Sequence, residues 1–431
     1  MLALLGFAII LIFLILIISK KVSVIVALVL TPVIIALIAG FKPLEIGQYS
    51  LEGIKQVAPT GILLMFAVLY FATMLDAGLF DPVISFIIRS VKGDPLKVIL
   101  GTAILSMIVH LDGDGTATFM IVLSAFLPIY KALKINKLVL PGIVAMSVGP
   151  IHLVPWSGTS ARALSVLQTD SVHLFTPNLP AIGAGILWVL FVAWYWGMRE
   201  RKKLGVIDFK YNHKEELTAE QKELRRPKLI LINAILTVLL IISLMEGWIP
   251  APVLFVIASM MVLQINYPKL ADQKKVLRSH GNNIFLVSSL IFAAGIFSGI
   301  LNGSGMIDAM ATSLVQLIPD EQSNFLPVLA AITSMPASLL FTPDAYYFGV
   351  LPVLAESATQ LNMDTIQMGR AALLGQMTVG FPLSPLTAST FLLIGLAEVE
   401  LGDHQRHTFL WAWGTTIVMA IVAVLTGSLS V

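Results

Sequence analysis

The sequence predicts an all-α polytopic membrane protein that is built from an inverted repeat. Three observations lead to this fold class: long apolar runs, a basic segment near the middle of the chain, and short motifs that recur in both halves. Of the 431 residues, 57% are hydrophobic and only 12% are charged. Since about a quarter of the residues of an average soluble domain are charged, the apolar runs are expected to lie in lipid.

Ten apolar runs are each long enough, as a helix, to cross a hydrocarbon core of about 30 Å. The first, residues 2–18, has no basic stretch before it and no small-residue cleavage site after it, so we expect a retained span rather than a signal peptide. The others lie near residues 22–40, 58–76, 138–156, 180–198, 229–246, 250–265, 284–301, 371–396 and 409–429. So many spans exclude a soluble enzyme, and the lack of cysteine excludes disulfides and thiolate metal sites.

Lys and Arg are concentrated in residues 199–228, RERKKLGVIDFKYNHKEELTAEQKELRRPK. Because cytoplasmic loops carry an excess of basic residues, this segment is expected to be a cytoplasmic linker between one repeat at 1–198 and another at 229–431. The other basic residues obey the same rule only if 98–130 and 326–356 each enter and leave on one side, as re-entrant hairpins. Each half then has about five crossings and one hairpin, and both termini lie outside.

The two halves share motifs in register. Asp114, in DGDGTATF, and Asp344, in FTPDAYYFG, are separated by 230 positions, and PWSGTS at 155–160 lies over PLTAST at 385–390 with the same offset. Because each half has an odd number of crossings, the repeats are expected to be inverted relative to each other. Inverted repeats with broken helices are the architecture of many secondary transporters.

Glycine and proline interrupt the apolar segments at four places. Two are the predicted hairpin tips, 111–116 and 341–346, and two are breaks within spans, 149–158 and 380–387. Non-helical backbone at membrane depth is tolerated only where it is buried in protein or lines a wet cavity. The four breaks, and the discontinuous helices around them, are therefore expected to converge on one site.

Acidic and basic side chains at these breaks are candidates for chemistry. An aspartate at the bilayer centre costs roughly 2.5–3.5 kcal/mol, so the tip aspartates need a cation, a proton or hydrogen-bond donors. The candidates for metal or proton binding are Asp112, Asp114, Asp344 and His152. The alternatives are that Asp112 or Asp344 caps a helix and that His152 is only packed.

The candidates for substrate binding are mostly hydroxyl residues at exposed helix N-termini, where anions are favoured. They are Thr116, Thr118, Ser157, Gly158, Thr159, Arg162, Ser384, Thr387, Ser389 and Thr390. Arg162 could hold a carboxylate bidentately or extend to a membrane surface, and the hydroxyls could instead bond helix carbonyls.

Acidic residues at both tips argue against a site for a simple carboxylate, because like charges repel. A carboxylate that is already complexed with a divalent metal fits better. Oxygen ligands of this kind suit Mg²⁺ or Ca²⁺, and a carboxylate that is shielded from water can also carry a proton.

At these residues the sequence resembles the citrate–metal:proton symporter family (CitMHS) of the ion transporter superfamily. The matching segments are LTPVIIALIAG (30–40), LFDPVISFIIRSVKGDPLKVILGTA (79–103), LDGDGTATF (111–119), PWSG with Ala161-Arg162-Ala163, FTPDAYYFGVLPVLAE (341–356) and ELGDHQ (400–405). Where the family usually has Asn-x-x-Pro-Trp-Gly-Gly, this chain has His152 and Ser157. The resemblance implies proton-driven uptake of citrate complexed with a divalent cation, a dimeric scaffold and a transport domain that moves as an elevator.

We therefore expect a multi-pass transporter of the cell membrane and not an enzyme. It is expected to be a homodimer in the lipid bilayer that binds no nucleic acid and has no permanently bound cofactor; Mg²⁺ or Ca²⁺ travels with citrate, and H⁺ is the coupling ion. The alternative is a Na⁺- or H⁺-coupled transporter of another di- or tricarboxylate without metal. An intramembrane aspartyl protease fits less well, because Gly113-Asp114-Gly115 is not the Gly-x-Gly-Asp arrangement such proteases use.

Overall fold

Helices make up all the regular structure of the described chain. The computed structural model describes residues 1–431 except 20–21, 92, 207–218, 317–323 and 431. The first half contains α1 (Leu2–Ile18), α2 (Val24–Ile38), α3 (Pro43–Ala77), α4 (Asp81–Val91), α5 (Pro95–Val109), η1 (His110–Asp112), α6 (Gly115–Ala132), α7 (Val139–Ile151), α8 (Gly158–Leu167), α9 (Ser171–Phe175), η2 (Thr176–Asn178) and α10 (Leu179–Leu204). The all-α fold class is therefore confirmed for the described residues.

The second half repeats this order of long, short and broken helices. It contains α11 (Ala219–Leu224), η3 (Pro227–Leu229), α12 (Ile230–Met245), α13 (Ala251–Asn266), α14 (Leu270–Gly303), α15 (Met306–Val315), α16 (Leu326–Ala337), the π-helical η5 (Ala345–Val350), α17 (Leu351–Gln360), α18 (Ile366–Leu373), η6 (Phe381–Leu383), α19 (Ala388–Ala397) and α20 (Leu401–Leu425). Thus α3 corresponds to α14, the pair α7–α8 to α18–α19, and α10 to α20.

Backbone conformation at helix ends supports the same correspondence. A positive φ is uncommon outside glycine, yet it occurs after α6 at Lys134 (56°) and after α17 at Asn362 (57°). It also occurs at the ends of α8 and α19, at Gln168 (51°) and Glu398 (57°). The two halves therefore share an order of helices and turns, while the inverted repeat in the membrane stays a prediction.

Among the described residues, seven helices or helix pairs are long and apolar enough to cross a membrane. They are Pro43–Ala77, Pro95–Asp112, Gly115–Ala132, Ser171–Leu204, Pro227–Met245, Leu270–Gly303 and Leu401–Leu425, and six shorter apolar helices accompany them. The predicted spans 58–76 and 284–301 lie within the longer helices α3 and α14, which start at Pro43 and Leu270 with polar turns that hydropathy does not detect. Both arms of the α5–α6 hairpin are long enough to cross the membrane. Their length therefore does not distinguish two crossings from a re-entrant hairpin, which stays a prediction.

The predicted linker 199–228 is partly helical. Its first residues continue α10 to Leu204, residues 207–218 lie outside the described part, and α11 and η3 occupy its end. Arg225 attaches that end to the first half: its Nη1 donates to the carbonyl of Leu75 at 2.5 Å and its Nε lies 3.1 Å from a carboxylate oxygen of Asp81.

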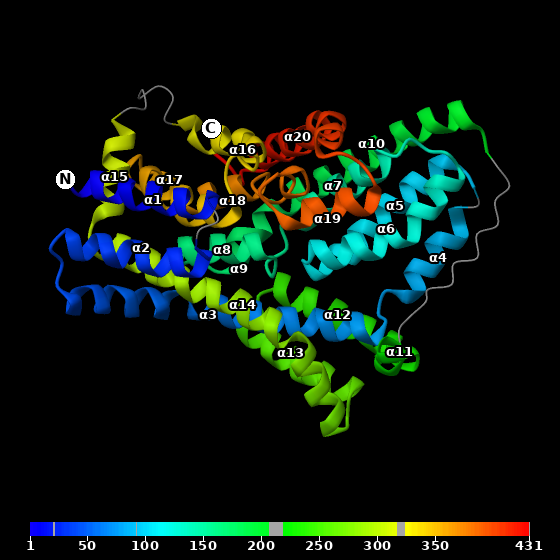
Figure 1. Cartoon of the computed structure of the whole chain (residues 1–431), viewed down its shortest axis with the longest axis horizontal. Helices are drawn as coiled ribbons and strands as arrows, with labels where there is room; N and C mark the ends of the chain where they lie inside the picture. Colours follow the sequence, from blue (N-terminus) through cyan, green and yellow to red (C-terminus); the bar gives the residue numbers. More distant parts are fainter. Residues whose placement is uncertain (20–21, 92, 207–218, 317–323, 431) are drawn as a thin grey trace.

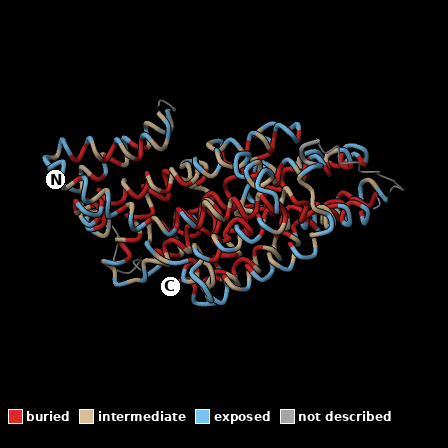
Figure 2. Tube along the Cα trace, turned by 90° about the horizontal axis from the view of Figure 1, so that it is seen from below, coloured by how far each residue is buried: buried red, intermediate tan, exposed pale blue. Residues whose placement is uncertain are grey.

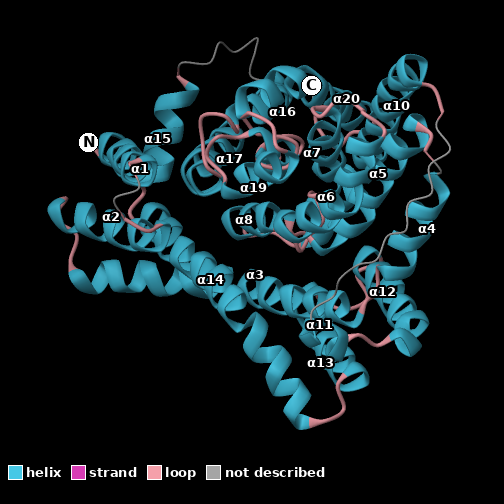
Figure 3. Ribbon diagram, turned by 45° about the vertical axis from the view of Figure 1, so that its right-hand side comes forward, coloured by secondary structure: helices cyan, strands magenta, loops and turns pink. Residues whose placement is uncertain are grey.

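The helices form two groups, which Figure 1 and Figure 3 show one above the other. In the first, α3 packs along α13 and α14, and α2 packs on α14. In the second, α5, α7, α10, α16, α18 and α20 pack together, and buried residues are concentrated inside the body (Figure 2). Helix α8 belongs to the second group and contacts both α3 and α14. It therefore carries its side chains to the boundary between the groups.

Candidate functional site

The tip between α5 and α6 is shaped by its two aspartates. Asp112 accepts a hydrogen bond from the backbone N–H of Asp114 at 2.8 Å, and Asp114 accepts one from the N–H of Thr116 at 2.8 Å as the N-cap of α6. Gly113 between them has φ 78°, which favours glycine. Both carboxylates thus support the turn, and that of Asp114 remains exposed.

The break between α7 and α8 lies against this tip. Helix α7 ends at His152, and α8 starts after Ser157, whose hydroxyl accepts the N–H of Ser160 at 3.2 Å. The indole Nε1 of Trp156 donates to the carbonyl of Leu111 at 2.7 Å. This bond joins the break directly to the tip.

The corresponding tip in the second half uses a different capping residue. Thr342, rather than Asp344, accepts the N–H of Ala345, at 3.2 Å, and Asp344 makes no capping bond. The alternative that Asp344 only caps the outgoing helix is therefore wrong. Asp344 precedes the π-helical turn η5, a type of turn that is frequent at functional sites.

Ser338 joins this second tip to the break after α18. Its hydroxyl oxygen accepts the N–H of Met377 at 2.8 Å, and its carbonyl accepts the hydroxyl of Ser384 at 2.5 Å. Met377 has φ 52°, a backbone conformation that costs a non-glycine residue energy and is typical of functional sites. Tip and break are thus held together in the second half as in the first.

Contacts at the breaks themselves join the first half to the second. The Nε of Arg162, on α8, donates to Oδ1 of Asp344 at 2.7 Å. The ring of Phe381, from the second break, lies 4.8 Å from that of His152 and 6.2 Å from that of His110, measured between centroids. All four breaks therefore converge, as the sequence predicts.

The predicted hydroxyl residues fall into two sets. The hydroxyls of Thr118, Ser157, Thr159, Ser384 and Thr390 are buried and bonded within the protein, largely to backbone carbonyls of the breaks. Thr116 is exposed, and Gly158, Thr387 and Ser389 are partly exposed. The buried set braces the breaks, and the accessible set can meet a ligand.

His110 also belongs to the site, although it is not among the site residues that the sequence analysis predicts. It is 0% exposed, its Nδ1 lies 3.0 Å from the Thr118 hydroxyl and its Nε2 lies 2.8 Å from Nδ1 of His152. Thr118 in turn donates to the carbonyl of Asp114 at 2.9 Å. A polar residue at the end of an apolar run, one residue before the tip, is the signal that could have found it.

Among the described residues, no three His, Asp or Glu side chains are grouped so that they could hold a metal ion. Asp114 and Asp344 are both near the convergence, but Asp344 is already paired with Arg162. A divalent cation at this place would need most of its ligands from a bound molecule.

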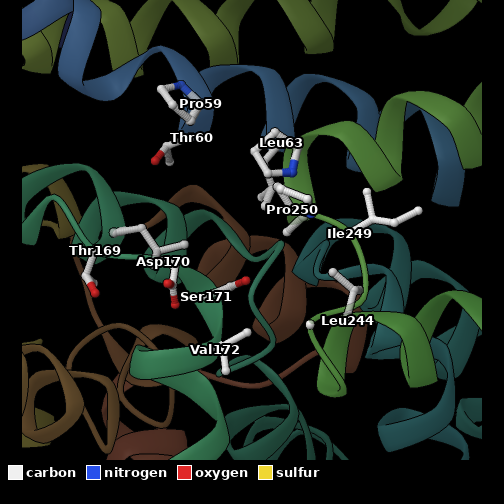
Figure 4. A pocket seen from close by; sticks show the side chains of 14 residues that line it. Pro59, Thr60, Leu63, Thr169, Asp170, Ser171, Val172, Leu244, Ile249 and Pro250 are labelled. Atoms are coloured by element: carbon white, nitrogen blue, oxygen red, sulfur yellow. The ribbon is translucent and has the colours of Figure 1, made fainter.

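A cavity of about 370 Å³ lies beside the site rather than in it (Figure 4). It is lined by Pro59 and Thr60 of α3, Leu164 of α8 and the segment from Thr169 to Val172, and none of the predicted site residues takes part. A second cavity of about 350 Å³ lies at the other side of the C-terminal end of α8, next to Gln168. Both occupy the boundary between the two groups of helices.

Sequence comparison gives relatives that extend over the whole chain. The chain is 49% identical over 430 residues to a citrate transporter of Bacillus subtilis (strain 168), with 100% of both chains covered. It is 46% identical over 433 residues to the Mg(2+)/citrate complex secondary transporter of the same organism, again with 100% of both covered. It is also 41% identical over 440 residues to the uncharacterized transporter YraO of that organism, with 100% of both covered.

The structure is similar to the crystal structure of the Alcanivorax borkumensis YdaH transporter, which is described as having an unusual topology. The TM-score is 0.55 at 12% identity, over 88% of this chain and 87% of that one, so the likeness concerns the fold alone. Residues 12–375 match the family CitMHS, described as citrate transporter. Together with its spanning helices, these matches show that the chain is a multi-pass membrane protein that belongs to the CitMHS family of citrate transporters.

Proposed function

We propose that the protein is a proton-coupled symporter of citrate complexed with a divalent cation. The observation that carries the proposal is that the break after α7 contacts both acidic tips: Arg162 pairs with Asp344 of the second tip, and Trp156 bonds the Leu111 carbonyl of the first tip. Such a site offers a positive group for a carboxylate and carboxylates for a cation. The name of one relative, a Mg(2+)/citrate complex secondary transporter, supports the same substrate class.

The accessible side chains divide between the two parts of the complex. The planar guanidinium of Arg162 suits a citrate carboxylate, and Thr116, Thr387 and Ser389 supply further polar groups within reach of water. Asp114 presents an exposed carboxylate to the cation. Citrate itself supplies the remaining cation ligands, which fits a site without a ready-made metal cluster among its described residues.

Protons complete the load in this proposal. Asp112, Asp114 and His152 are the candidate carriers, because each lies at the convergence of the breaks. Citrate has about three negative charges at neutral pH, so its complex with one divalent cation is an anion. If two protons accompany it, net positive charge enters, and the membrane potential contributes about 2.3 kcal/mol per charge per 100 mV.

The two groups of helices suggest how the site changes sides. The group around α3, α13 and α14 is the proposed scaffold of a homodimer, and the group of α5–α10 with α16–α20 is the proposed transport domain that moves as an elevator. The repeats 1–198 and 229–431 are then inverted, the linker 199–228 is cytoplasmic, and both termini lie outside.

Uptake of labelled citrate into proteoliposomes tests the proposal. An inward proton gradient is imposed with Mg²⁺, with Ca²⁺, or with a chelator and no added metal, each with and without Na⁺. We expect uptake that requires a divalent cation, follows the proton gradient and is independent of Na⁺. Uptake that survives chelation would favour the alternative, a transporter of metal-free carboxylate. Uptake that requires Na⁺ would mean that Na⁺, not H⁺, is the coupling ion.

A further inference from the structure

The ion pair between Arg162 and Asp344 joins the two halves of the repeat. Its residues are 182 positions apart, its atoms are separated by 2.7 Å, and the side chains are only 14% and 11% exposed. It is the most buried of the ion pairs that the structure gives between Arg or Lys and an acidic residue in its described part. The pair lies at the convergence of the breaks.

No helix cap or turn in the described structure depends on the pairing of Arg162 with Asp344. Asp344 has no capping role, since Thr342 holds the adjacent N–H group. Arg162 gives one further hydrogen bond, from Nη1 to the carbonyl of Gly158 at 2.8 Å, which orients its guanidinium within α8. Asp114, at the equivalent position of the first half, is by contrast exposed and occupied with the N–H of Thr116.

We propose that this pair is a counter-ion pair that only the complete cation–citrate complex can replace; the inference rests on the function proposed above. A carboxylate of citrate takes the place of Asp344 on the guanidinium of Arg162. The cation, carried by the same citrate, takes the place of Arg162 at the carboxylate of Asp344. Both buried charges exchange one partner for another, and neither is left alone.

Each part of the load is rejected by itself for an electrostatic reason. Metal-free citrate bound to Arg162 would leave the carboxylate of Asp344 unpaired and beside a second anion. A free cation bound to Asp344 would leave Arg162 unpaired and beside a second cation. An unpaired charge in a mostly buried place is strongly unfavourable, and the repulsion of like charges adds to it. Arg162 and Asp344 therefore determine that citrate and cation bind together.

Calorimetry of citrate binding to the purified, full-length protein tests this inference, with Mg²⁺ or with a chelator. Asp344→Asn keeps the size of the side chain and removes no helix cap, but it leaves Arg162 free of its anion. We expect the wild type to bind citrate at least tenfold more weakly in chelator than in Mg²⁺, and Asp344→Asn to bind metal-free citrate at least tenfold more tightly than the wild type does. Asp76→Asn is the matched control. Asp76 lies away from the site, where its carboxylate oxygen is 2.8 Å from Nε2 of His280, so this variant should keep the metal dependence of the wild type.

A measurement on the wild type alone avoids any question of folding. Thermal unfolding in detergent should shift upward with Mg²⁺ and citrate together, and by much less with either alone. An equal shift with Mg²⁺ alone would overturn the inference, as would an Asp344→Asn protein that still needs metal. If the wild type instead binds citrate equally well with and without metal, the function proposed above fails as well, so the two failures are distinguishable.

Discussion

Asp114 and Asp344 occupy equivalent positions, but their carboxylates have different partners. Asp114 caps α6 by accepting the N–H of Thr116, whereas Asp344 is paired with Arg162 from the other half. The role of Asp114 in the turn can be separated from its charge, because Asn caps a helix about as well as Asp does. This gives a test of whether the charge itself is needed for transport.

Asp114→Asn should keep the thermal stability of the wild type and lose citrate uptake at least tenfold. Asp114→Ala should lose uptake equally, and should also lose about 1 kcal/mol of stability because the cap is gone. Uptake in proteoliposomes and thermal unfolding in detergent measure the two effects. An Asn variant with wild-type uptake would reduce Asp114 to a capping residue.

Replacement of His110 by Phe should destabilise the protein by about 1–3 kcal/mol, since it removes the hydrogen-bond partner of the buried Nδ1 of His152 and one of the two hydrogen bonds of the Thr118 hydroxyl. Thermal unfolding measures the effect. His173→Phe is the control: His173 is mostly exposed and its side chain bonds only Asp170, so the change should stay within about 0.5 kcal/mol. Equal stability of the two variants would show that the contacts of His110 carry no energy.

The sequence identifies the charged residues of the site better than it identifies their partners. Asp112, Asp114, Asp344 and Arg162 stand out because a charge in an apolar segment needs a reason. Their pairing depends on how two halves meet in space, and no local pattern contains that information. The partner of His110 is equally non-local, since His152 is 42 positions away.

At the scale of helices, α3 and α14 pack unusually closely. A Cβ atom added to Gly53 would lie 1.9 Å from the carbonyl oxygen of Gly295, and one added to Gly299 would lie 2.3 Å from that of Tyr49. These glycines let the two longest helices touch backbone to backbone, beside the contact of both helices with α8. The apolar cores of α3 and α14 are predictable from hydropathy, but their polar first turns are not.

Gly53→Ala should destabilise the protein by about 1–3 kcal/mol, because the helices must move apart to accept the methyl group. Gly47→Ala, on the same helix but with nothing within 4 Å of the added atom, is the matched control. It should be neutral or stabilising by about 0.5–1 kcal/mol, since Ala favours the helix more than Gly does. Thermal unfolding of both variants decides; a neutral Gly53→Ala variant would contradict the close packing.

At the scale of the whole molecule, the repeat is visible in the order of the helices and in the positive φ angles at their ends. The sequence predicts this repeat because DGDGTATF and FTPDAYYFG fall at the same distance from PWSGTS and PLTAST. The side of the membrane on which each helix ends follows only from the distribution of Lys and Arg. Inversion is therefore the part of the architecture that most needs a direct test.

Single cysteines at two equivalent positions provide that test, because the natural chain contains no cysteine. Lys134, after α6, and Asn362, after α17, are both exposed and have φ 56° and 57°. If the repeats are inverted, a membrane-impermeant maleimide applied to intact cells should label Asn362→Cys and not Lys134→Cys. Labelling of Lys134→Cys should appear only after the membrane is opened; labelling of both from the same side would mean that the halves are parallel.

Simultaneous measurement of citrate and cation flux into the same proteoliposomes decides whether one site carries both. Labelled citrate and ⁴⁵Ca²⁺ or a Mg²⁺-sensitive dye are followed under an inward proton gradient. We expect the two to enter in equal amounts, with neither entering alone, and both to stop in the Arg162→Gln variant. Citrate that enters without the cation, or in a proportion that changes with cation concentration, would contradict transport of the complex.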